Sequence, residues 1–381
     1  MQKILHTPEG VRDLYSRECE QKRLLQERIL TVIRSFGYHG IETPTFEYFD
    51  VFGADIGTTP SKDLYKFFDR EGNTLALRPD FTPSVARAAA KYFLPANEPV
   101  RLTYLGNTFV NSSEYRGRMK ENTNLGAELI GDGSVDADAE VIALVIRSLL
   151  AAGLENFQIS IGHAGYFKAL AEAADLEPQE VDELRRLCSN KNTFGVEKLL
   201  SATASRGNME ATEALKKLPR MFGGVEILQE AAVSCTNPDA VQALNRLRDI
   251  YEILKFYHVE RYVSFDLGML NGYSYYTGIV FRGYTFGTGD TIVKGGRYDH
   301  LLGCFGKEAP AVGFVTVTDQ LLLALMRQKI ELEPGQERRI IRYQDATRKE
   351  AIEEAEALRA EGYAVELIHE AEDTYGPDEQ K

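Results

Sequence analysis

The feature that most constrains the fold of this chain is a long helical block between two parts that are rich in strand patterns. From about residue 164 to 256 the sequence is typical of almost continuous helix, as in KALAEAADL, PQEVDELRRLCS, VEKLLSAT, ATEALKKL and PDAVQALNRLRDIYEILKFY. Strand patterns precede this block and return over residues 261–318. A helical block between two sheet-forming parts indicates an insertion into a larger domain. We therefore expect an α+β fold with a helical insertion at about 164–256.

The sequence before the block predicts both helices and strands. Apolar residues at helical spacing indicate an amphipathic helix over 14–36, while 101–110, 125–131 and 157–162 have the character of strands. The stretch YKFFDREGNTLALRPD predicts a β-hairpin with its turn at residues 70–73. These elements are sufficient for a sheet flanked by helices.

Two helix starts are also expected. In TPSVARAAAKYF, Thr82 has the side chain of an N-cap and Pro83 suits the first helical position. In DGSVDADAE, Asp136 or Asp138 is expected to begin the next helix. The same string resembles a calcium loop only superficially, because the glycine required at its sixth position is missing.

The end of the chain reads as a separate small segment. After LLLALMRQK, the stretch ELEPGQER is typical of a linker. One strand (RRIIRY), one helix (TRKEAIEEAEALRAEG) and one strand (YAVELI) then predict a βαβ unit. We expect domains at 1–325 and 336–381, with the acidic last dozen residues frayed.

Composition narrows the class of protein. The net charge of −13 argues against RNA binding, which usually needs a basic face. No segment approaches 18 uncharged apolar residues and the first residues lack a signal-peptide core, so we expect a cytoplasmic protein without membrane contact. The six histidines are scattered and the cysteines form no CxxC pair, which indicates neither a zinc site nor a disulfide framework. The four cysteines are Cys19, Cys188, Cys235 and Cys304.

Six blocks of the sequence follow one another as in histidyl-tRNA synthetases. They are EGVRDLYSREC, LALRPDFTPSVARA, the loop before LGAELIG, NGYSYYTGIVF, KGGRYDHLL and AVGFVTVTDQLLLAL. The resemblance covers about residues 7–325. It implies the class II aminoacyl-tRNA synthetase fold, an antiparallel sheet flanked by helices, which is usually dimeric and contains a helical insertion.

The chain departs from that family where the chemistry of adenylation would take place. Three arginines expected by resemblance are replaced, by Val110, Asn271 and Gln320, and two expected glutamates by Ser112 and Asp319. Arginines hold a triphosphate and stabilise the charge that develops on pyrophosphate. Removing one such contact costs roughly 100-fold in rate. We therefore expect no catalytic residue and no adenylation.

The residues that bind the amino acid in the resembling synthetases are better preserved in this chain than those of adenylation. By resemblance, an acidic residue and a threonine receive the α-amino group, an amide contacts the amino acid, a glutamate faces the imidazole, and two aromatics enclose it. Carboxylates and aromatic walls of this kind suit an ammonium group and an imidazole N–H. An arginine of the polar loop remains for the carboxylate. The matching residues are Asp80, Thr82, Asn124, Glu128, Tyr275, Tyr276 and Arg118.

A second resemblance follows from these departures and from the short tail. About 45 residues follow the linker, fewer than the anticodon-binding domain of the synthetases. The start HTPEGVRDL, the string RPDFTP and the tail resemble the regulatory subunits of the short-form ATP phosphoribosyltransferase. This implies a non-catalytic role in histidine biosynthesis, a short-form catalytic subunit as partner, histidine as feedback inhibitor, a dimer, and neither cofactor nor tRNA.

Other interpretations of the same residues stay open at this point. The chain could be a residual ATP-dependent ligase of histidine or an analogue, with replacement cations among Arg116, Arg118 and Lys120. The tyrosines could be ordinary core residues of a strand, and both face one pocket only if that strand twists or bulges. Glu128 on the apolar strand LGAELIG needs a partner if it faces inward and is merely solvated if that face points outward. GTGDT is interpreted as a turn between strands, and Arg297 as a candidate for the pocket floor.

Overall fold

The structure is a computed structural model that describes residues 5–53, 56, 59–96, 98–111, 119–203, 206–233, 235–270, 275–333 and 338–370. The chain divides into two compact units, Met1–Glu331 and Leu332–Lys381. The division falls inside the interval that separates the two expected domains.

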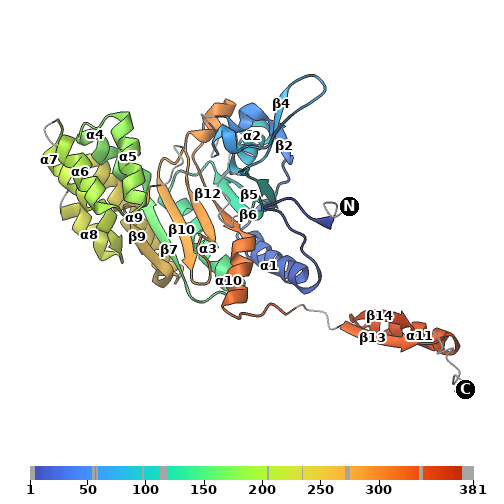
Figure 1. The fold of residues 1–381 in the computed structure, drawn as a ribbon. Helices are drawn as coiled ribbons and strands as arrows, with labels where there is room; N and C mark the ends of the chain where they lie inside the picture. Colours follow the sequence, from blue (N-terminus) through green and yellow to red (C-terminus); the bar gives the residue numbers. More distant parts are fainter. Residues whose placement is uncertain are drawn as a thin grey trace, which may run out of the picture. The chain divides into compact units, whose positions relative to one another are not determined.

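A nine-stranded sheet forms the frame of the larger unit (Figure 1). Its strands lie in the order β1, β5, β6, β12, β11, β10, β7, β9, β8. The six strands from β5 to β7 are antiparallel, which confirms the predicted sheet, whereas β1 and β9 run parallel to β5 and β7. The bounds are β1 His39–Gly40, β5 Val100–Phe109, β6 Glu121–Ile130, β7 Phe157–His163, β8 Phe222–Gly223, β9 Val263–Asp266, β10 Ile279–Thr285, β11 Val293–Arg297 and β12 Ala311–Val317.

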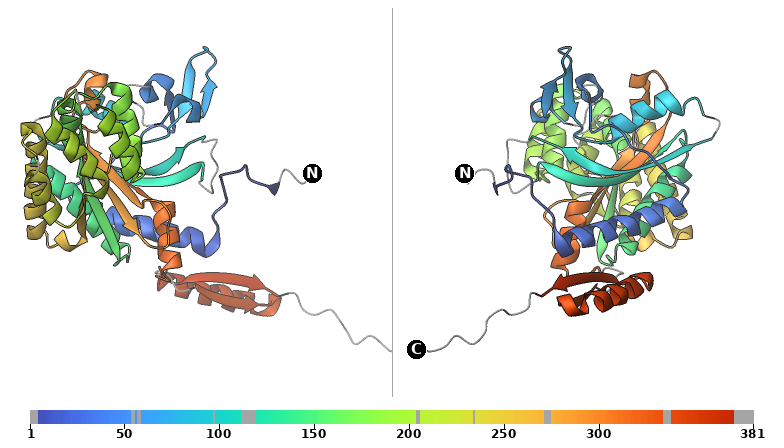
Figure 2. Two further views of the ribbon diagram at one scale, coloured as in Figure 1. Left: turned by 60° about the vertical axis from the view of Figure 1, so that its left-hand side comes forward. Right: turned by 90° about the vertical axis from the view of Figure 1, so that its right-hand side faces the viewer.

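Three helices pack together against this sheet (Figures 1 and 2). Helix α1 contacts α3 and α10, and both of those helices contact β12. Leu25, Ile29 and Ile33 recur every four residues along α1 and are fully buried, so the predicted amphipathic helix is confirmed. The bounds are α1 Ser16–Ser35, α3 Val135–Ala151 and α10 Thr318–Arg327.

Helix α2 (Thr82–Tyr92) begins one residue earlier than the sequence prediction has it. Thr82 is already helical, so the expected N-cap at Thr82 is wrong. Phe81 is the N-cap and has no side-chain capping bond, and a carboxylate oxygen of Asp80 accepts instead from the backbone N–H groups of Phe81 (2.6 Å) and Thr82 (3.3 Å). The Thr82 hydroxyl is thereby left for another partner.

The start of α3 also differs from the prediction. Ser134 is the N-cap, and its hydroxyl accepts from the backbone N–H of Ala137 at 3.2 Å. Asp136 and Asp138 lie inside the first turn instead. Asp138 is fully buried, because it pairs with two arginines from distant parts of the chain.

A three-stranded sheet, in the order β2, β4, β3, stands beside the main sheet. Strands β3 and β4 form the predicted antiparallel hairpin. Its turn contains Gly72 at φ +86°, a backbone conformation that favours glycine. The bounds are β2 Phe46–Tyr48, β3 Lys66–Phe68 and β4 Thr74–Leu77.

The helical block is confirmed and connects two neighbouring strands. In the described part of the chain, six α-helices and the short strand β8 follow β7, and the block returns to β9, which is parallel to β7. The long helix α9 packs on α3, α4 and β7 and thus joins the block to the core of the sheet unit. The bounds are α4 Ala164–Ala173, α5 Pro178–Ser189, α6 Thr193–Thr203, α7 Met209–Lys217, α8 Glu226–Val233 and α9 Pro238–Phe256.

The smaller unit contains the predicted βαβ arrangement. Strands β13 (Arg338–Tyr343) and β14 (Ala364–His369) are parallel, and α11 (Arg348–Ala360) connects them and packs on both. Ala351, Ala355 and Val365 are buried between helix and strands. In the part of the chain that the structure describes, no helix has the length and apolar character needed to cross a membrane.

Candidate functional site

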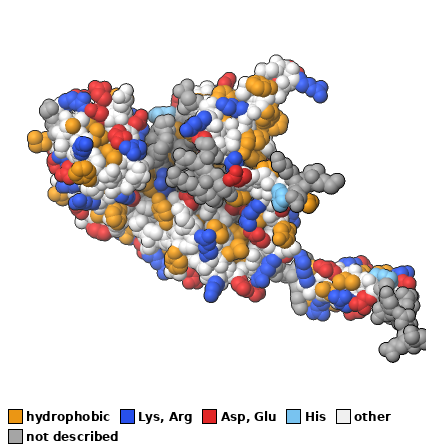
Figure 3. All heavy atoms as spheres, in the orientation of Figure 1, with side chains coloured by type: hydrophobic (Ala, Val, Ile, Leu, Met, Phe, Trp, Pro, Cys, Tyr) orange, Lys and Arg blue, Asp and Glu red, His pale blue; other side chains and the backbone are white. Residues whose placement is uncertain are grey.

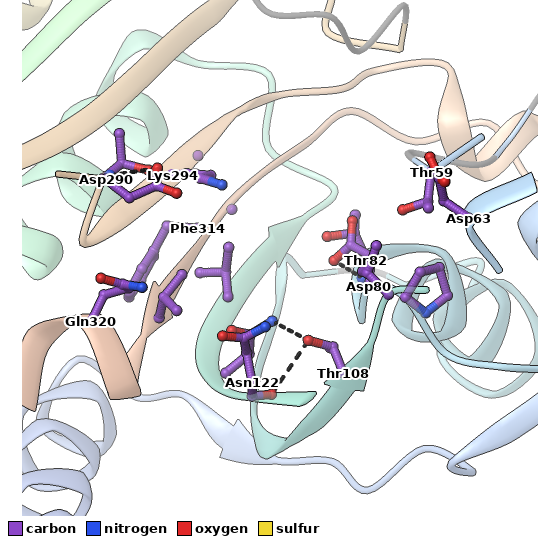
Figure 4. A pocket seen from close by; sticks show the side chains of 18 of the residues that line it. Thr59, Asp63, Asp80, Thr82, Thr108, Asn122, Asp290, Lys294, Phe314 and Gln320 are labelled. Carbon is purple, nitrogen blue, oxygen red and sulfur yellow. Dashed lines mark hydrogen bonds between the residues drawn. The ribbon is translucent and has the colours of Figure 1, made fainter. Parts of the chain in front are cut away.

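A cavity of about 380 Å³ lies on the main sheet, and Figure 4 shows many of the side chains that line it. Strands β6, β11 and β12 form part of its lining, the segment at the start of α2 another, and the segment before β10 a third. Six of the seven predicted site residues line this one cavity: Asp80, Thr82, Asn124, Glu128, Tyr275 and Tyr276. Arg118, like Arg116, Ser112 and Asn271, lies outside the described residues.

Glu128 is the most deeply buried acid of the cavity, with 1% of its surface exposed. Its Oε1 accepts from the hydroxyls of Thr82 (3.0 Å) and Tyr104 (3.3 Å), and its Oε2 accepts from the hydroxyl of Tyr298 (2.5 Å). A carboxylate has about four acceptor positions. Three hydroxyls therefore leave Glu128 with capacity for one further donor, such as an N–H group of a ligand.

Burial raises the pKa of Glu128 to about 8, even though the hydroxyls of Tyr298 and Thr82 act in the opposite direction. No cation is among the hydrogen-bond partners that the structure describes for this carboxyl group. A ligand that brings a positive charge or a strong N–H donor would therefore favour its ionised form.

Gly313 of β12 makes room for the Glu128 carboxylate. The two residues are paired in register, and a Cβ atom at position 313 would lie 1.5 Å from Oε2 of Glu128. We expect Gly313→Ala to displace this side chain and to lower the free energy of unfolding by about 2–3 kcal/mol. Urea denaturation measures the effect. The control is Gly289→Ala, which places its methyl group where no heavy atom lies within 4 Å. Equal stability of the two variants would contradict the prediction.

Asp80 and Thr82 lie side by side at the N-terminus of α2, where both line the cavity (Figure 4). One oxygen of Asp80 is held by the backbone at the start of the helix. The hydroxyl of Thr82 donates to Glu128 and so fixes the relative positions of the two acids. Asp80, Thr82 and Glu128 thus bring two acids and one hydroxyl group into the same cavity.

Asn124 lies four residues before Glu128 on β6, so strand alternation places both on the same face. Its amide nitrogen donates to the hydroxyl of Thr108 at 2.9 Å. Its carbonyl oxygen is buried and accepts no hydrogen bond from any residue that the structure describes. A buried acceptor of this kind suits an N–H donor of a bound molecule.

Tyr275 and Tyr276 both line the cavity, although they are adjacent in sequence. The residues precede β10, so the expected strand conformation is wrong at this point and strand alternation does not apply. Their ring centroids are 4.6 Å apart. The ring of Tyr276 lies directly over Gly296, where a Cβ atom would come within 2.5 Å of it. The two rings therefore form one wall, which is called the tyrosine wall below.

Sequence reasoning missed two tyrosines that hold Glu128. Tyr298 follows Arg297 in the KGGRYD block, and Tyr104 lies on β5 with its ring stacked 4.4 Å from that of Phe81. A tyrosine on a strand next to an inward glutamate is the one signal that could have identified Tyr104. Arg297 does not line the cavity, so its expected place in the pocket floor is wrong; it pairs with Asp138 instead.

The described lining of the cavity contains few cations. Among the described lining residues the basic ones are Lys120 and Lys294, against four acids, Asp63, Asp80, Glu128 and Asp290. Val110 and Gln320 line the cavity at two of the positions where the sequence lacks the expected arginines. This charge balance suits an ammonium-bearing ligand better than a triphosphate.

Asp319 does not face the cavity. Its carboxylate accepts from Nζ of Lys22 (2.7 Å) and from the backbone N–H of Thr123 (2.7 Å). The acid therefore ties α10 to α1 and β6, which is a structural role. The GTGDT stretch forms the connection between β10 and β11, as the sequence predicts.

Comparison with known proteins gives one consistent result. The histidyl-tRNA synthetase family matches residues 10–321. An ATP phosphoribosyltransferase regulatory subunit from Acetivibrio thermocellus is 40% identical, over 95% of this chain and 86% of that protein. One from Clostridium kluyveri is 38% identical, over 96% of this chain and 93% of that protein. The chain belongs to the family of ATP phosphoribosyltransferase regulatory subunits.

Solved structures agree with membership of the regulatory-subunit family. The crystal structure of an ATP phosphoribosyltransferase regulatory subunit/histidyl-tRNA synthetase from Bacillus halodurans C is 36% identical, covers 96% of this chain and 93% of its own, and has a TM-score of 0.86. Histidyl-tRNA synthetase from Nostoc is 20% identical, covers 97% of this chain and 87% of its own, and has a TM-score of 0.80. The latter likeness shows the fold, and the predicted class II architecture is thereby confirmed.

Proposed function

We propose that the chain is the regulatory, non-catalytic subunit of a short-form ATP phosphoribosyltransferase and acts in the cytoplasm in the first step of histidine biosynthesis. The partner is the short catalytic subunit, and histidine is the feedback inhibitor. No tRNA takes part, in keeping with the net charge of −13. The observation that carries the proposal, beyond family membership, is the buried Glu128 in a cavity that has kept amino-acid contacts without the arginines of adenylation.

The cavity supports a specific arrangement of bound histidine. The α-ammonium group lies against Asp80 and Thr82, and the imidazole N–H donates to the remaining acceptor position of Glu128. The tyrosine wall encloses the imidazole ring, and the buried carbonyl of Asn124 accepts a further N–H. Arg118 is proposed to bind the carboxylate. Histidine lowers activity because it binds better to the less active form of the assembled enzyme.

Reconstitution of the complex tests this function. The purified chain is mixed with a short-form catalytic subunit, and formation of phosphoribosyl-ATP is measured with and without histidine. We expect strong activation that histidine reverses. Activation without inhibition would keep the assembly role and remove the proposed role of the cavity. No activation of a folded catalytic subunit, together with histidine-dependent exchange of pyrophosphate into ATP, would indicate the ligase instead.

The three-stranded sheet supports a proposal of self-association. Register places Phe46, Tyr48, Phe67, Leu75 and Leu77 on one of its faces. The three aromatic residues are exposed, and Phe46 and Phe67 contact edge to face at 5.6 Å. Figure 3 shows hydrophobic side chains gathered over this part of the molecule. An exposed apolar face of this kind marks an interface, and a two-fold dimer lets identical faces meet.

A charge on this face is expected to weaken the dimer. The double variant Phe46→Asp, Tyr48→Asp puts two carboxylates where the partner's apolar face would lie, and we expect its dimer dissociation constant to rise at least about 100-fold. Analytical ultracentrifugation over a range of concentrations measures it. Phe194→Asp is the control, because Phe194 is an exposed aromatic residue of the helical block. An unchanged dimer in the double variant would refute this interface.

A further inference from the structure

A network of charged side chains runs from the helical block to the sheet beneath the cavity. Its centre is Asp138 of α3, which is fully buried. Oδ2 of Asp138 accepts from Nε of Arg246 at 2.7 Å, and Oδ1 accepts from Nε of Arg297 at 2.8 Å. Arg246 lies on α9 and Arg297 on β11. One carboxylate therefore joins the long helix of the block to the sheet.

The network continues from Arg297 to the residue that follows the tyrosine wall. Nη1 of Arg297 donates to Oδ1 of Asp299 at 3.0 Å, and Oδ2 of Asp299 accepts from the hydroxyl of Thr277 at 3.0 Å. The backbone N–H of Thr277 also donates to the carbonyl of Arg297 at 2.9 Å. The Thr277 hydroxyl also donates to the carbonyl of Arg297 at 3.4 Å and accepts from the backbone N–H of Asp299 at 3.1 Å. Because Thr277 directly follows Tyr276, these four hydrogen bonds with the network set where the tyrosine wall lies.

Close packing makes this placement strict. A Cβ atom at Gly278 would lie 2.9 Å from Cδ of Arg297, so the segment after Thr277 passes directly over the arginine side chain. Arg297 is itself 2% exposed and also donates to the carbonyl of Asp132 at 3.1 Å. Its position is therefore fixed from two sides. A shift of Arg297 would have to move the wall residues with it.

The same short segment reaches the cavity from the other side. Tyr298 lies between Arg297 and Asp299, and its hydroxyl donates to Glu128. The ring of Tyr275 meets that of Tyr298 edge to face at 6.0 Å. Within residues 297–299, Tyr298 contacts the buried Glu128 of the cavity, while Arg297 and Asp299 on either side of it belong to the network.

We propose that Thr277 and Asp299 are positioning residues of the ligand pocket, and that Asp138 couples the pocket to α9 of the helical block. Neither Arg246 nor Asp138 lines the cavity, yet histidine affinity depends on both through this chain of contacts. Conversely, whatever moves α9 changes the affinity of the pocket for histidine, because coupling between two sites is reciprocal. This inference rests on the proposed function, since it concerns the same pocket.

The test measures L-histidine binding to the full chain by isothermal titration calorimetry. Thr277→Val removes the hydroxyl and keeps the shape, and we expect affinity to fall about tenfold. Thr277→Ser restores the hydroxyl and should bind within about twofold of the unmodified chain. In the helical block, Arg246→Gln is expected to lower affinity about fivefold. Thermal unfolding is recorded for each variant, and binding is compared well below every midpoint.

Matched controls separate coupling from general loss of stability. Thr236→Val removes another hydroxyl that donates to a carboxylate, that of Glu210 at 2.8 Å, and Arg206→Gln removes another ion pair of the block, with Glu180. Both controls should leave affinity within about twofold. The double variant Thr277→Val, Arg246→Gln should lose about tenfold rather than about fiftyfold, because both changes break one network.

The outcomes distinguish this inference from the function on which it rests. If the unmodified chain binds histidine and Thr277→Val binds equally well, the positioning role is refuted and the proposed function stands. If both single variants weaken binding but their effects multiply in the double variant, the coupling through Asp138 is refuted. If the unmodified chain does not bind histidine, the proposed pocket itself is wrong and the inference falls with it.

Discussion

Glu128→Gln will bind histidine about 10-fold more weakly than the unmodified chain near pH 6.5, and about 100-fold more weakly near pH 7.5 or above. The pKa of Glu128 in the empty pocket is raised to about 8 by burial. Below that value most of the carboxyl is protonated, and a ligand that donates to the carboxylate must first displace the proton. Each pH unit below the pKa costs about 1.4 kcal/mol, or about tenfold in affinity.

The ratio of the two affinities is the quantity to measure, because the protonation of free histidine enters both affinities and cancels where the two proteins bind the same form of the ligand. Titration calorimetry at several pH values provides this ratio. Glu121→Gln serves as the control, since Glu121 lies on the same strand, accepts from Asn107 at 2.6 Å and does not line the cavity. A ratio that does not change with pH would show that Glu128 binds the ligand as the neutral acid or does not contact it.

Elements that depend on local sequence were predictable. The helical block and the C-terminal βαβ unit follow from periodicity within single segments, and both are confirmed. Glu128 was found for a similar reason, because an acid on the apolar strand LGAELIG must either face solvent or have partners. Its three hydroxyl partners show that the second alternative holds.

Features that depend on tertiary contacts were not predictable from single segments. Thr82 has the side chain of an N-cap, but Asp80 accepts from the first backbone N–H groups, and the hydroxyl of Thr82 turns to a glutamate 46 residues away. Tyr104 becomes a partner of Glu128 because strands β5 and β6 pair in one particular register. Local propensity cannot encode that register.

The two aspartates of α3 illustrate the same limit. Asp136 and Asp138 have equal claims to start the helix by sequence, yet one is exposed and the other is completely buried. What distinguishes them is the position of Arg297, 159 residues further along the chain. A charged residue in an acidic string thus became the centre of an ion-pair network that no local pattern indicates.

Asp138→Ala is accordingly expected to cost about 3–5 kcal/mol of unfolding free energy, a large part of the roughly 5–15 kcal/mol that stabilises a typical domain. Removing the carboxylate leaves Arg297, with 3% of its side chain exposed, without its main counter-charge, and also frees Arg246 of α9. Asp299 at 3.0 Å then remains as the counter-charge of Arg297, but it is itself partly exposed, and a buried charge that loses its buried partner costs more than the pair stabilised. The free energy of unfolding of Asp138→Asn should lie between those of the unmodified chain and of Asp138→Ala, because the amide keeps the shape and one acceptor but not the charge.

Urea denaturation followed by circular dichroism measures the loss as a lower midpoint, with an unchanged slope if the transition stays cooperative. Asp136→Ala is the matched control: the same substitution, in the same first turn of α3, at an exposed side chain. It removes only an interaction with the helix dipole and should cost less than about 1 kcal/mol. If the two alanine variants are equally stable, the buried ion pairs are no stronger than a surface charge. Asp138 would then be too weak a link to hold the helical block and the tyrosine wall in register.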